Sequence, residues 1–134
     1  MNAGDTEFPA TLLIVEADIL VRHVLADYLR SCGYEVLEAT SGEEAQIILE
    51  VEAERVEAVL ADAASTGGLD GFALARWLRE THPHIDVVLA GSPAMAATQA
   101  TDLCEDGPAV EKPYQPQHVL ERIKWLKAQR DRRR

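Results

Sequence analysis

Two hydrophobic periods alternate along the chain. Short, continuous apolar runs are typical of strands that are buried on both faces of a sheet. These runs predict strands at 11–15, 34–39, 56–63, 86–91 and 108–112. Between them, apolar residues recur every three or four positions, as they do on one face of a helix. This second period predicts helices at 18–32, 41–54, 70–82, 92–103 and 115–130.

Polar residues and glycine mark the ends of these helices. Asp18 and Ser92 are residue types that cap helix N-termini, and Pro93 suits the first helical turn. Gly33 suits the end of the first helix, because glycine readily adopts the backbone conformation that closes a helix. Five strand–helix repeats predict an α/β fold, a doubly wound parallel sheet of five strands with helices on both faces.

Length and composition fit one domain with an aliphatic core. The chain has 134 residues, of which 47% are hydrophobic but only 5% aromatic. We expect the domain at 11–128, preceded by a leader at 1–10 and followed by a basic tail at 129–134.

Charge is distributed unevenly. Residues 122–134 hold seven basic residues and one acid and so carry +6, whereas the whole chain carries −10 and the preceding part therefore −16. A body this acidic repels phosphate backbones, so we expect no binding to nucleic acid. The "RDRRR" tail is either a small anion-binding or docking patch or, as we favour, a solvated and frayed helix end.

The two cysteines, Cys32 and Cys104, form neither a CxxC motif nor a Cys/His cluster, so they do not indicate zinc. The sequence allows a disulfide between the two cysteines. Because the N-terminal residues lack the pattern of an export signal, however, we favour reduced thiols and a cytoplasmic protein. No apolar run approaches the roughly 20 residues that a membrane-spanning helix needs.

The predicted sheet brings distant polar residues to one edge. Right-handed crossovers place the carboxyl ends of all parallel strands together, and ligands of such sheets bind there. Glu16 and Asp18 follow the first strand, Asp62 ends the third, and Lys112 ends the fifth. Carboxylates with a nearby lysine suit Mg²⁺-assisted phosphoryl chemistry, in which a carboxylate can itself be the nucleophile.

These motifs resemble those of the receiver domain of two-component response regulators, over roughly residues 11–126. The resemblance is carried by "LLIVEADILVR", "VLADAASTGGLDGFALARWLR", "HPHIDVVLAGS" and "VEKPYQPQHVLERI". The family has an acid pair, a phosphoacceptor aspartate, a "DG", a hydroxyl residue and a "KP" at these places. The resemblance implies the flavodoxin-like receiver fold, with strand order 2-1-3-4-5.

The resemblance also implies roles for individual residues. Asp62 corresponds to the phosphoacceptor, and Lys112 to the lysine that contacts the phosphoryl group, with a cis bond to Pro113. A metal, by the same resemblance Mg²⁺, would be held by Glu16, Asp62 and the backbone carbonyl of Ala64.

Several positions depart from the family pattern. Ala17 replaces the second acid, which removes an oxygen ligand and should weaken Mg²⁺ binding by at least ~10-fold. Ala90 and Ala109 replace the hydroxyl and the aromatic residue that report phosphorylation, and Ser65-Thr66 replaces a Met-Pro pair. Ser92 offers a hydroxyl two residues after Ala90, but it is better placed to cap the following helix.

Two functions therefore compete. In the first, Asp62 accepts a phosphoryl group from a histidine kinase or a histidine phosphotransfer protein, and the domain signals by contact with an output protein in a phosphorelay. In the second, a degenerate receiver serves as a phosphorylation-independent interaction module. A flavodoxin-like FMN binder or a small phosphatase is disfavoured, because the loop after the first strand has no phosphate cradle.

The same resemblance sets expectations about activity and assembly. We expect no enzymatic activity other than self-phosphorylation from a donor and slow autodephosphorylation. We also expect no binding to membranes. A homodimer is possible through the face formed by 92–103, 108–112 and 115–130. The chain is either a stand-alone receiver or part of a longer protein.

Overall fold

Among the residues that the structure describes, four parallel strands form the central sheet in the order β2-β1-β3-β4. The structure, a computed structural model, describes residues 10–64, 68–109 and 117–133. The strands are β1 (Thr11–Val15), β2 (Glu35–Ala39), β3 (Val56–Asp62) and β4 (Asp86–Ala90). All five residues of β1 are buried, as the continuous apolar run of its last four residues predicts.

Strand register aligns the carboxyl ends of the strands. Val15 pairs with Ala61 of β3, and Asp62 pairs with Ala90 of β4. Glu16, which directly follows Val15, therefore lies beside the end of β3. This is the edge on which the sequence places the candidate site.

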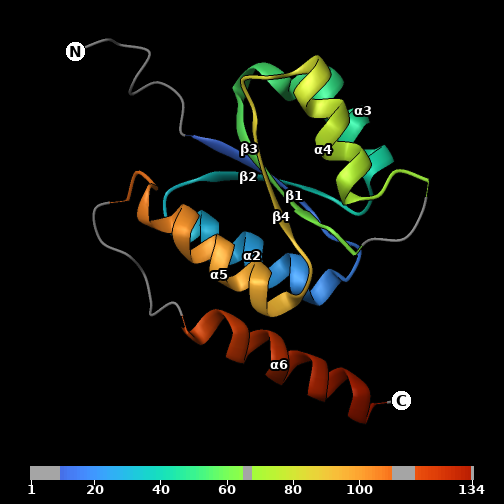
Figure 1. Cartoon of the computed structure of the whole chain (residues 1–134). Coiled ribbons are helices and arrows are strands. Elements are labelled where there is room, and N and C mark those ends of the chain that lie inside the picture. The colour runs from blue at the N-terminus through green and yellow to red at the C-terminus, as the bar shows by residue number, and fades with distance from the viewer. Residues whose placement is uncertain (1–9, 65–67, 110–116, 134) are drawn as a thin grey trace.

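In the described part of the chain, five α-helices and one short 3₁₀ helix accompany the sheet, and Figure 1 shows helices on both of its faces. They are α2 (Ile19–Ser31), α3 (Gly42–Glu52), η1 (Ala53–Arg55), α4 (Gly71–Thr81), α5 (Pro93–Glu105) and α6 (Gln117–Arg132). The predicted caps are confirmed: Asp18 accepts a hydrogen bond from the Leu20 N–H, and Ser92 accepts one from the Met95 N–H. Gly33 adopts a positive φ of 100° directly after the first helix ends.

The helices form two layers, with α3 and α4 on one face of the sheet and α2, α5 and α6 on the other (Figure 1). Alternate residues of β1 feed two separate cores: Leu12 and Ile14 pack beneath α2, α5 and α6, whereas Leu13 and Val15 pack beneath α3 and α4. The predicted α/β receiver fold, doubly wound around a parallel sheet, is confirmed. No helix in the described part of the chain is long and apolar enough to cross a membrane.

The predicted fifth strand, at 108–112, is not observed among the described residues. Pro108 and Ala109 are not in a strand, and the remaining three positions lie outside the described residues. The Ala109 N–H donates to the Cys32 carbonyl at the end of α2 rather than to a neighbouring strand. The predicted strand order is therefore observed for its first four strands.

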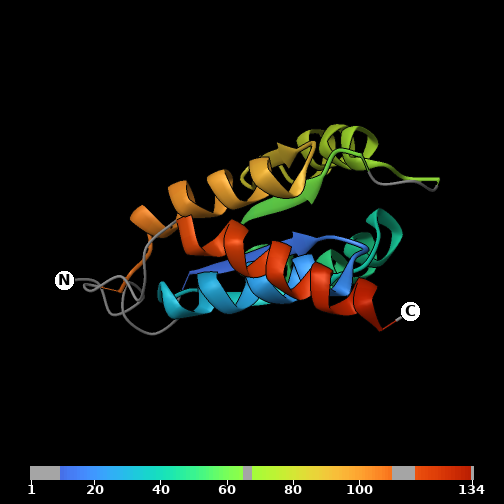
Figure 2. The ribbon, with the colours of Figure 1, turned by 90° about the horizontal axis from the view of Figure 1, so that it is seen from below.

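The last helix lies antiparallel to α2 and α5 (Figures 1 and 2). Arg130, near the C-terminus of α6, contacts Asp18, the N-cap of α2. A helix that followed a fifth parallel strand would begin at the carboxyl edge of the sheet, whereas α6 ends there. Val119 and Ile123 anchor this helix in the core, where both side chains are fully buried. The helix continues through Arg132, so most of the segment predicted as a basic tail is helical.

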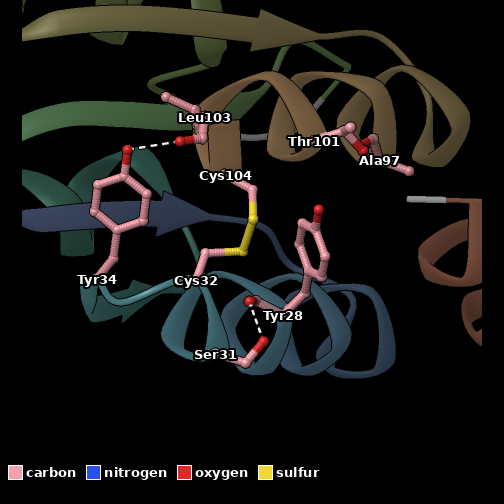
Figure 3. The surroundings of a disulfide bond; sticks show 8 residues. All are labelled: Tyr28, Ser31, Cys32, Tyr34, Ala97, Thr101, Leu103 and Cys104. Carbon is pink, nitrogen blue, oxygen red and sulfur yellow. Dashed lines mark hydrogen bonds between the residues drawn. A yellow bond between two sulfur atoms is a disulfide. The ribbon is translucent and has the colours of Figure 1, made fainter. Parts of the chain in front are cut away.

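The prediction of reduced thiols is wrong. Cys32 and Cys104 form a buried disulfide whose Cα atoms lie 5.3 Å apart, within the range that the bond requires (Figure 3). The sequence could not show this, because Cys32 ends α2 and Cys104 lies in the last turn of α5, 72 residues away. Packing of these two helices on the same face of the sheet brings the cysteines together. The Tyr34 hydroxyl donates to the Leu103 carbonyl beside them.

Candidate functional site

Glu16 is the first acid of the edge, and its own loop holds it in place. Its Oε2 accepts the Asp18 N–H at 2.8 Å, and its backbone carbonyl accepts Arg22 Nη1 at 2.9 Å. Burial raises the pKa of the Glu16 carboxyl above its usual value, and the charges of Asp62 and Asp18 raise it further, against the opposing effects of the Asp18 N–H and Lys127. Its surroundings thus favour the charged form of Glu16 less than bulk water does.

Asp62 ends β3, next to Glu16. Its Oδ1 accepts the Ala64 N–H at 2.8 Å, while the neighbouring Ala63 N–H donates to the Ala90 carbonyl of β4. The side chain is partly accessible, so its second oxygen remains available to an incoming group. Glu16, Asp62 and Ala90 line one small cavity of about 10 Å³, roughly the room for one water molecule.

Two glycines allow the loop after β3 to pass close to other backbone. A Cβ on Gly71 would lie 2.6 Å from the Asp62 carbonyl oxygen, and a Cβ on Gly42 would lie 2.4 Å from the Leu69 carbonyl oxygen. Asp70 caps α4 by accepting the Ala73 N–H, so the "DG" pair combines a helix cap with close backbone contact. These contacts fix the position of α4 against the residue that the sequence predicts as phosphoacceptor.

Asp18 is neutralised by the last helix. Arg130 donates from Nη1 to Oδ1 at 3.0 Å and from Nη2 to Oδ2 at 3.1 Å, and the Lys127 ammonium lies 3.9 Å from Oδ2. Partial burial alone would raise the pKa of Asp18, but hydrogen bonds from Arg130 and the Leu20 N–H and the charges of Arg130 and Lys127 outweigh it, so this pKa lies below its usual value. Asp18 is therefore a charged carboxylate whose two oxygens are already bound.

The sequence did not predict the role of Arg130 and Lys127. The favoured interpretation of the basic end as solvated and frayed is wrong for Arg130. Two features of the sequence indicate this role. The basic residues are concentrated near the C-terminus of an otherwise acidic chain, and Lys127 and Arg130 are three positions apart, which places both side chains on one helix face. It was missed because a fifth strand would have directed the end of the last helix away from the acids.

The positions that depart from the family pattern are distributed over both ends of the sheet. Ala17 is exposed at the acid edge, and Ala90 is buried beside Asp62. Ala109 lies at the opposite edge, next to Cys32. Lys112, its bond to Pro113 and the Ser65-Thr66 pair lie outside the described residues.

Two carboxylates at this edge have the chemistry of a magnesium site. Glu16 and Asp62 each accept one backbone N–H and keep further lone pairs, and Mg²⁺ commonly uses one or two carboxylates with water and phosphate oxygens. Within the described residues, no three acidic, histidine or cysteine side chains form a metal-binding group. The two carboxylates of Glu16 and Asp62 fit a cation that is held by few protein ligands.

Comparison with known sequences identifies relatives. Residues 12–124 match the family described as Response regulator receiver domain. The chain is also 40% identical over 87 residues, 65% of its length, to the sensor kinase CckA of Brucella abortus (strain 2308). It spans 9% of the length of that kinase.

Solved structures of receiver domains and response regulators are similar in fold to this chain. A putative response regulator from Chloroflexus aurantiacus J-10-fl is 30% identical with a TM-score of 0.56, covering 90% of this chain and 98% of that one. The receiver domain from the hybrid histidine kinase CckA is 28% identical with a TM-score of 0.53, covering 70% and 97%. The CheX-CheY-BeF3-Mg+2 complex from Borrelia burgdorferi is 23% identical with a TM-score of 0.61, covering 92% of this chain and 93% of that one. At this identity the similarity concerns the fold alone.

Proposed function

Because this chain belongs to the response regulator receiver domain family, we propose that it acts in phosphorelay signal transduction by accepting a phosphoryl group on Asp62. The observation that carries this proposal is the register of β1 and β3, which sets Asp62 beside Glu16 at the carboxyl edge of the sheet. Asp62 is partly accessible there, and the Glu16 carboxylate beside it is a second oxygen ligand of the kind that Mg²⁺ prefers.

The proposed reaction transfers a phosphoryl group from a phosphohistidine of a histidine kinase or a histidine phosphotransfer protein. A carboxylate oxygen of Asp62 attacks phosphorus, the phosphorus–nitrogen bond breaks, and the electron pair returns to the imidazole of the donor. The Ala64 N–H holds Asp62 Oδ1 and leaves the second oxygen to attack. Glu16, Asp62 and the Ala64 carbonyl would hold Mg²⁺, which when bound would supply positive charge to the phosphoryl oxygens. In this proposal Lys112 contacts the phosphoryl group.

A second candidate function is a phosphorylation-independent interaction module. It is favoured by Ala17, which leaves the edge without the usual second acid, and by Ala90, whose methyl group cannot bind a phosphoryl oxygen. With Ala109 at the aromatic position, no side chain among these three can report phosphorylation. The two functions differ in whether Asp62 is modified at all.

One experiment separates the two functions. We expect the protein incubated with a small phosphodonor and Mg²⁺ to gain a base-labile phosphoryl mass, mapped to Asp62 by peptide mass spectrometry. Asp62→Asn should gain none, because an amide is not a nucleophile at this position. Ala17→Asp should raise the yield at limiting Mg²⁺, because it adds an oxygen ligand.

The outcomes are distinct. Modification of wild type but not of Asp62→Asn supports the phosphorelay function. If wild type gains no phosphoryl group and Ala17→Asp does, the degenerate module is the correct reading and the missing acid is its cause. If neither protein reacts, phosphoryl transfer to Asp62 is excluded for this chain.

Further proposals concern setting and assembly. We propose a cytoplasmic protein that catalyses no reaction beyond its own phosphorylation and slow dephosphorylation, and that transmits its signal to an output protein by contact. The likeness to a hybrid histidine kinase receiver supports a kinase as donor. A homodimer through α5, 108–112 and α6 stays a prediction, and light scattering with and without phosphodonor would test it.

A further inference from the structure

We propose that α6 is a built-in strap on the acid edge, whose Arg130 and Lys127 compete with a divalent cation for the negative charge of Asp18, Glu16 and Asp62. In this proposal the strap lowers cation affinity when it is engaged, and a bound cation weakens the engagement of the strap. The inference rests on the cation site proposed above, but its test uses no phosphodonor.

The contact between Arg130 and Asp18 has the geometry of a specific ion pair. Each guanidinium Nη atom donates to one carboxylate oxygen, at 3.0 and 3.1 Å, which is the bidentate arrangement that arginine forms and lysine cannot. Asp18 also accepts the Leu20 N–H, so its orientation is fixed by the start of α2. Arg130 is thus held by a carboxylate that cannot easily turn away.

Lys127 extends the positive charge toward the other acids. It lies one helical turn before Arg130, with its ammonium 3.9 Å from Asp18 Oδ2, and Asp18 is joined to Glu16 because its N–H donates to Glu16 Oε2 at 2.8 Å. The strap therefore acts on a carboxylate of the proposed cation site, besides the cap that it contacts directly.

The strap can release without unfolding the helix. Val119 and Ile123 anchor the first half of α6 in the core, but the side chains of Lys127 and Arg130 remain 36% and 35% exposed. The terminal groups of long, half-exposed side chains change rotamer at a lower cost than fully buried side chains do. Arg130 can thus leave Asp18 while α6 stays docked.

Competition follows from electrostatics. The positive charges of the strap and of a divalent cation are attracted by the same small group of acids, so each reduces the attraction of the other. Linkage makes the effect reciprocal: if the strap lowers cation affinity by some factor, the cation weakens the strap by the same factor. Because Ala17 stands where the family has a second acid, the negative field of the remaining acids is already weak, and the positive charges of the strap reduce it further.

The test measures Mn²⁺ binding by calorimetry at low ionic strength for wild type, Arg130→Gln and Lys127→Gln. We expect Arg130→Gln to bind Mn²⁺ about fivefold more tightly than wild type, and Lys127→Gln to show a smaller gain. Arg132→Gln is the matched control, because it removes the same charge from an exposed position on the same helix. Circular dichroism and thermal unfolding confirm that each variant folds.

A second background separates a held side chain from a general field. In Asp18→Asn the arginine loses its ionic acceptor, so we expect the further change Arg130→Gln to alter Mn²⁺ affinity by less than it does in wild type. Equal gains in Mn²⁺ affinity in Arg130→Gln and Arg132→Gln would overturn the proposal that α6 is a strap. So would the absence of saturable Mn²⁺ binding in the Arg130→Gln/Lys127→Gln double variant. Failure of Asp62 to take a phosphoryl group would leave the result unaffected.

Discussion

Asp18 combines two structural roles in one side chain. It caps α2 by accepting the Leu20 N–H, and it binds the guanidinium of Arg130 with both oxygens. The sequence predicted the cap, because an aspartate directly before a helical period is a local signal. The ion pair required knowledge of where the C-terminal helix ends, which no local pattern contains.

At the scale of single residues, Gly71 makes the sharpest demand on the fold. We expect Gly71→Ala to lower the free energy of unfolding by about 1–2 kcal/mol, because the new Cβ would meet the Asp62 carbonyl oxygen at 2.6 Å and the clash exceeds the gain in helix propensity. The displaced backbone should also reduce phosphoryl yield on Asp62. Urea denaturation and the mass assay measure the two effects.

Gly68 supplies the control for this substitution. A Cβ there would meet nothing within 4 Å, although the residue lies in the same loop. We expect Gly68→Ala to leave stability unchanged or to raise it by up to ~1 kcal/mol, since alanine restricts the unfolded chain. Equal losses at both positions would refute the argument from close backbone contact.

At the scale of elements, local signals predicted the helices and the first four strands. Strand β3 and helix α4 lie within a few residues of their predicted ranges, because apolar runs, periodic faces and caps are written within each segment. The fifth strand was predicted from a short apolar run and from the resemblance to the receiver family. Ala109 uses its N–H on the end of α2, a contact between segments that are distant in sequence and thus without a local signal.

The disulfide between α2 and α5 is another contact between distant segments, and it makes a prediction. Joining residues 72 apart should stabilise the protein by about 4 kcal/mol through restriction of the unfolded chain. We expect the Cys32→Ala/Cys104→Ala variant to unfold at a markedly lower urea concentration than the oxidised protein. Reductant should lower the stability of wild type and leave that of the variant unchanged.

A reductant-insensitive wild type would contradict this prediction, provided that thiol titration shows that the bond is broken. The titration is needed because both cysteines are buried and react slowly in the folded state. Loss of the disulfide should change the phosphoryl yield on Asp62 little, since Cys32 lies at the opposite end of α2 from Asp18.

At the scale of the whole molecule, the direction of α6 decides which end of the fold carries the basic residues. The site acids Glu16 and Asp62 were predictable, because parallel strands gather their carboxyl ends. The positive partner was not, because a reversed last helix exchanges the two ends. The reversed direction of α6 thus places the basic residues Lys127 and Arg130 beside the acids at the carboxyl edge of the sheet.

A spin label tests this direction. With both native cysteines in the disulfide, Arg132→Cys can be labelled selectively. We expect the label to broaden the amide signals of Asp18, Ile19 and Leu20, at the start of α2, rather than those of Ser31 and Gly33, about 20 Å away at its end. Broadening at the end of α2 instead would show that α6 runs the other way.

The distance in sequence between Asp18 and Arg130 also has a consequence for the order of folding. The two residues are 112 positions apart, so their contact is among the least local in the molecule. During synthesis from the N-terminus, the strands and their acids emerge before α6 exists. A nascent chain therefore presents Glu16, Asp18 and Asp62 without their counter-charges, and the edge acquires its final balance only when the last turns of the last helix have been made.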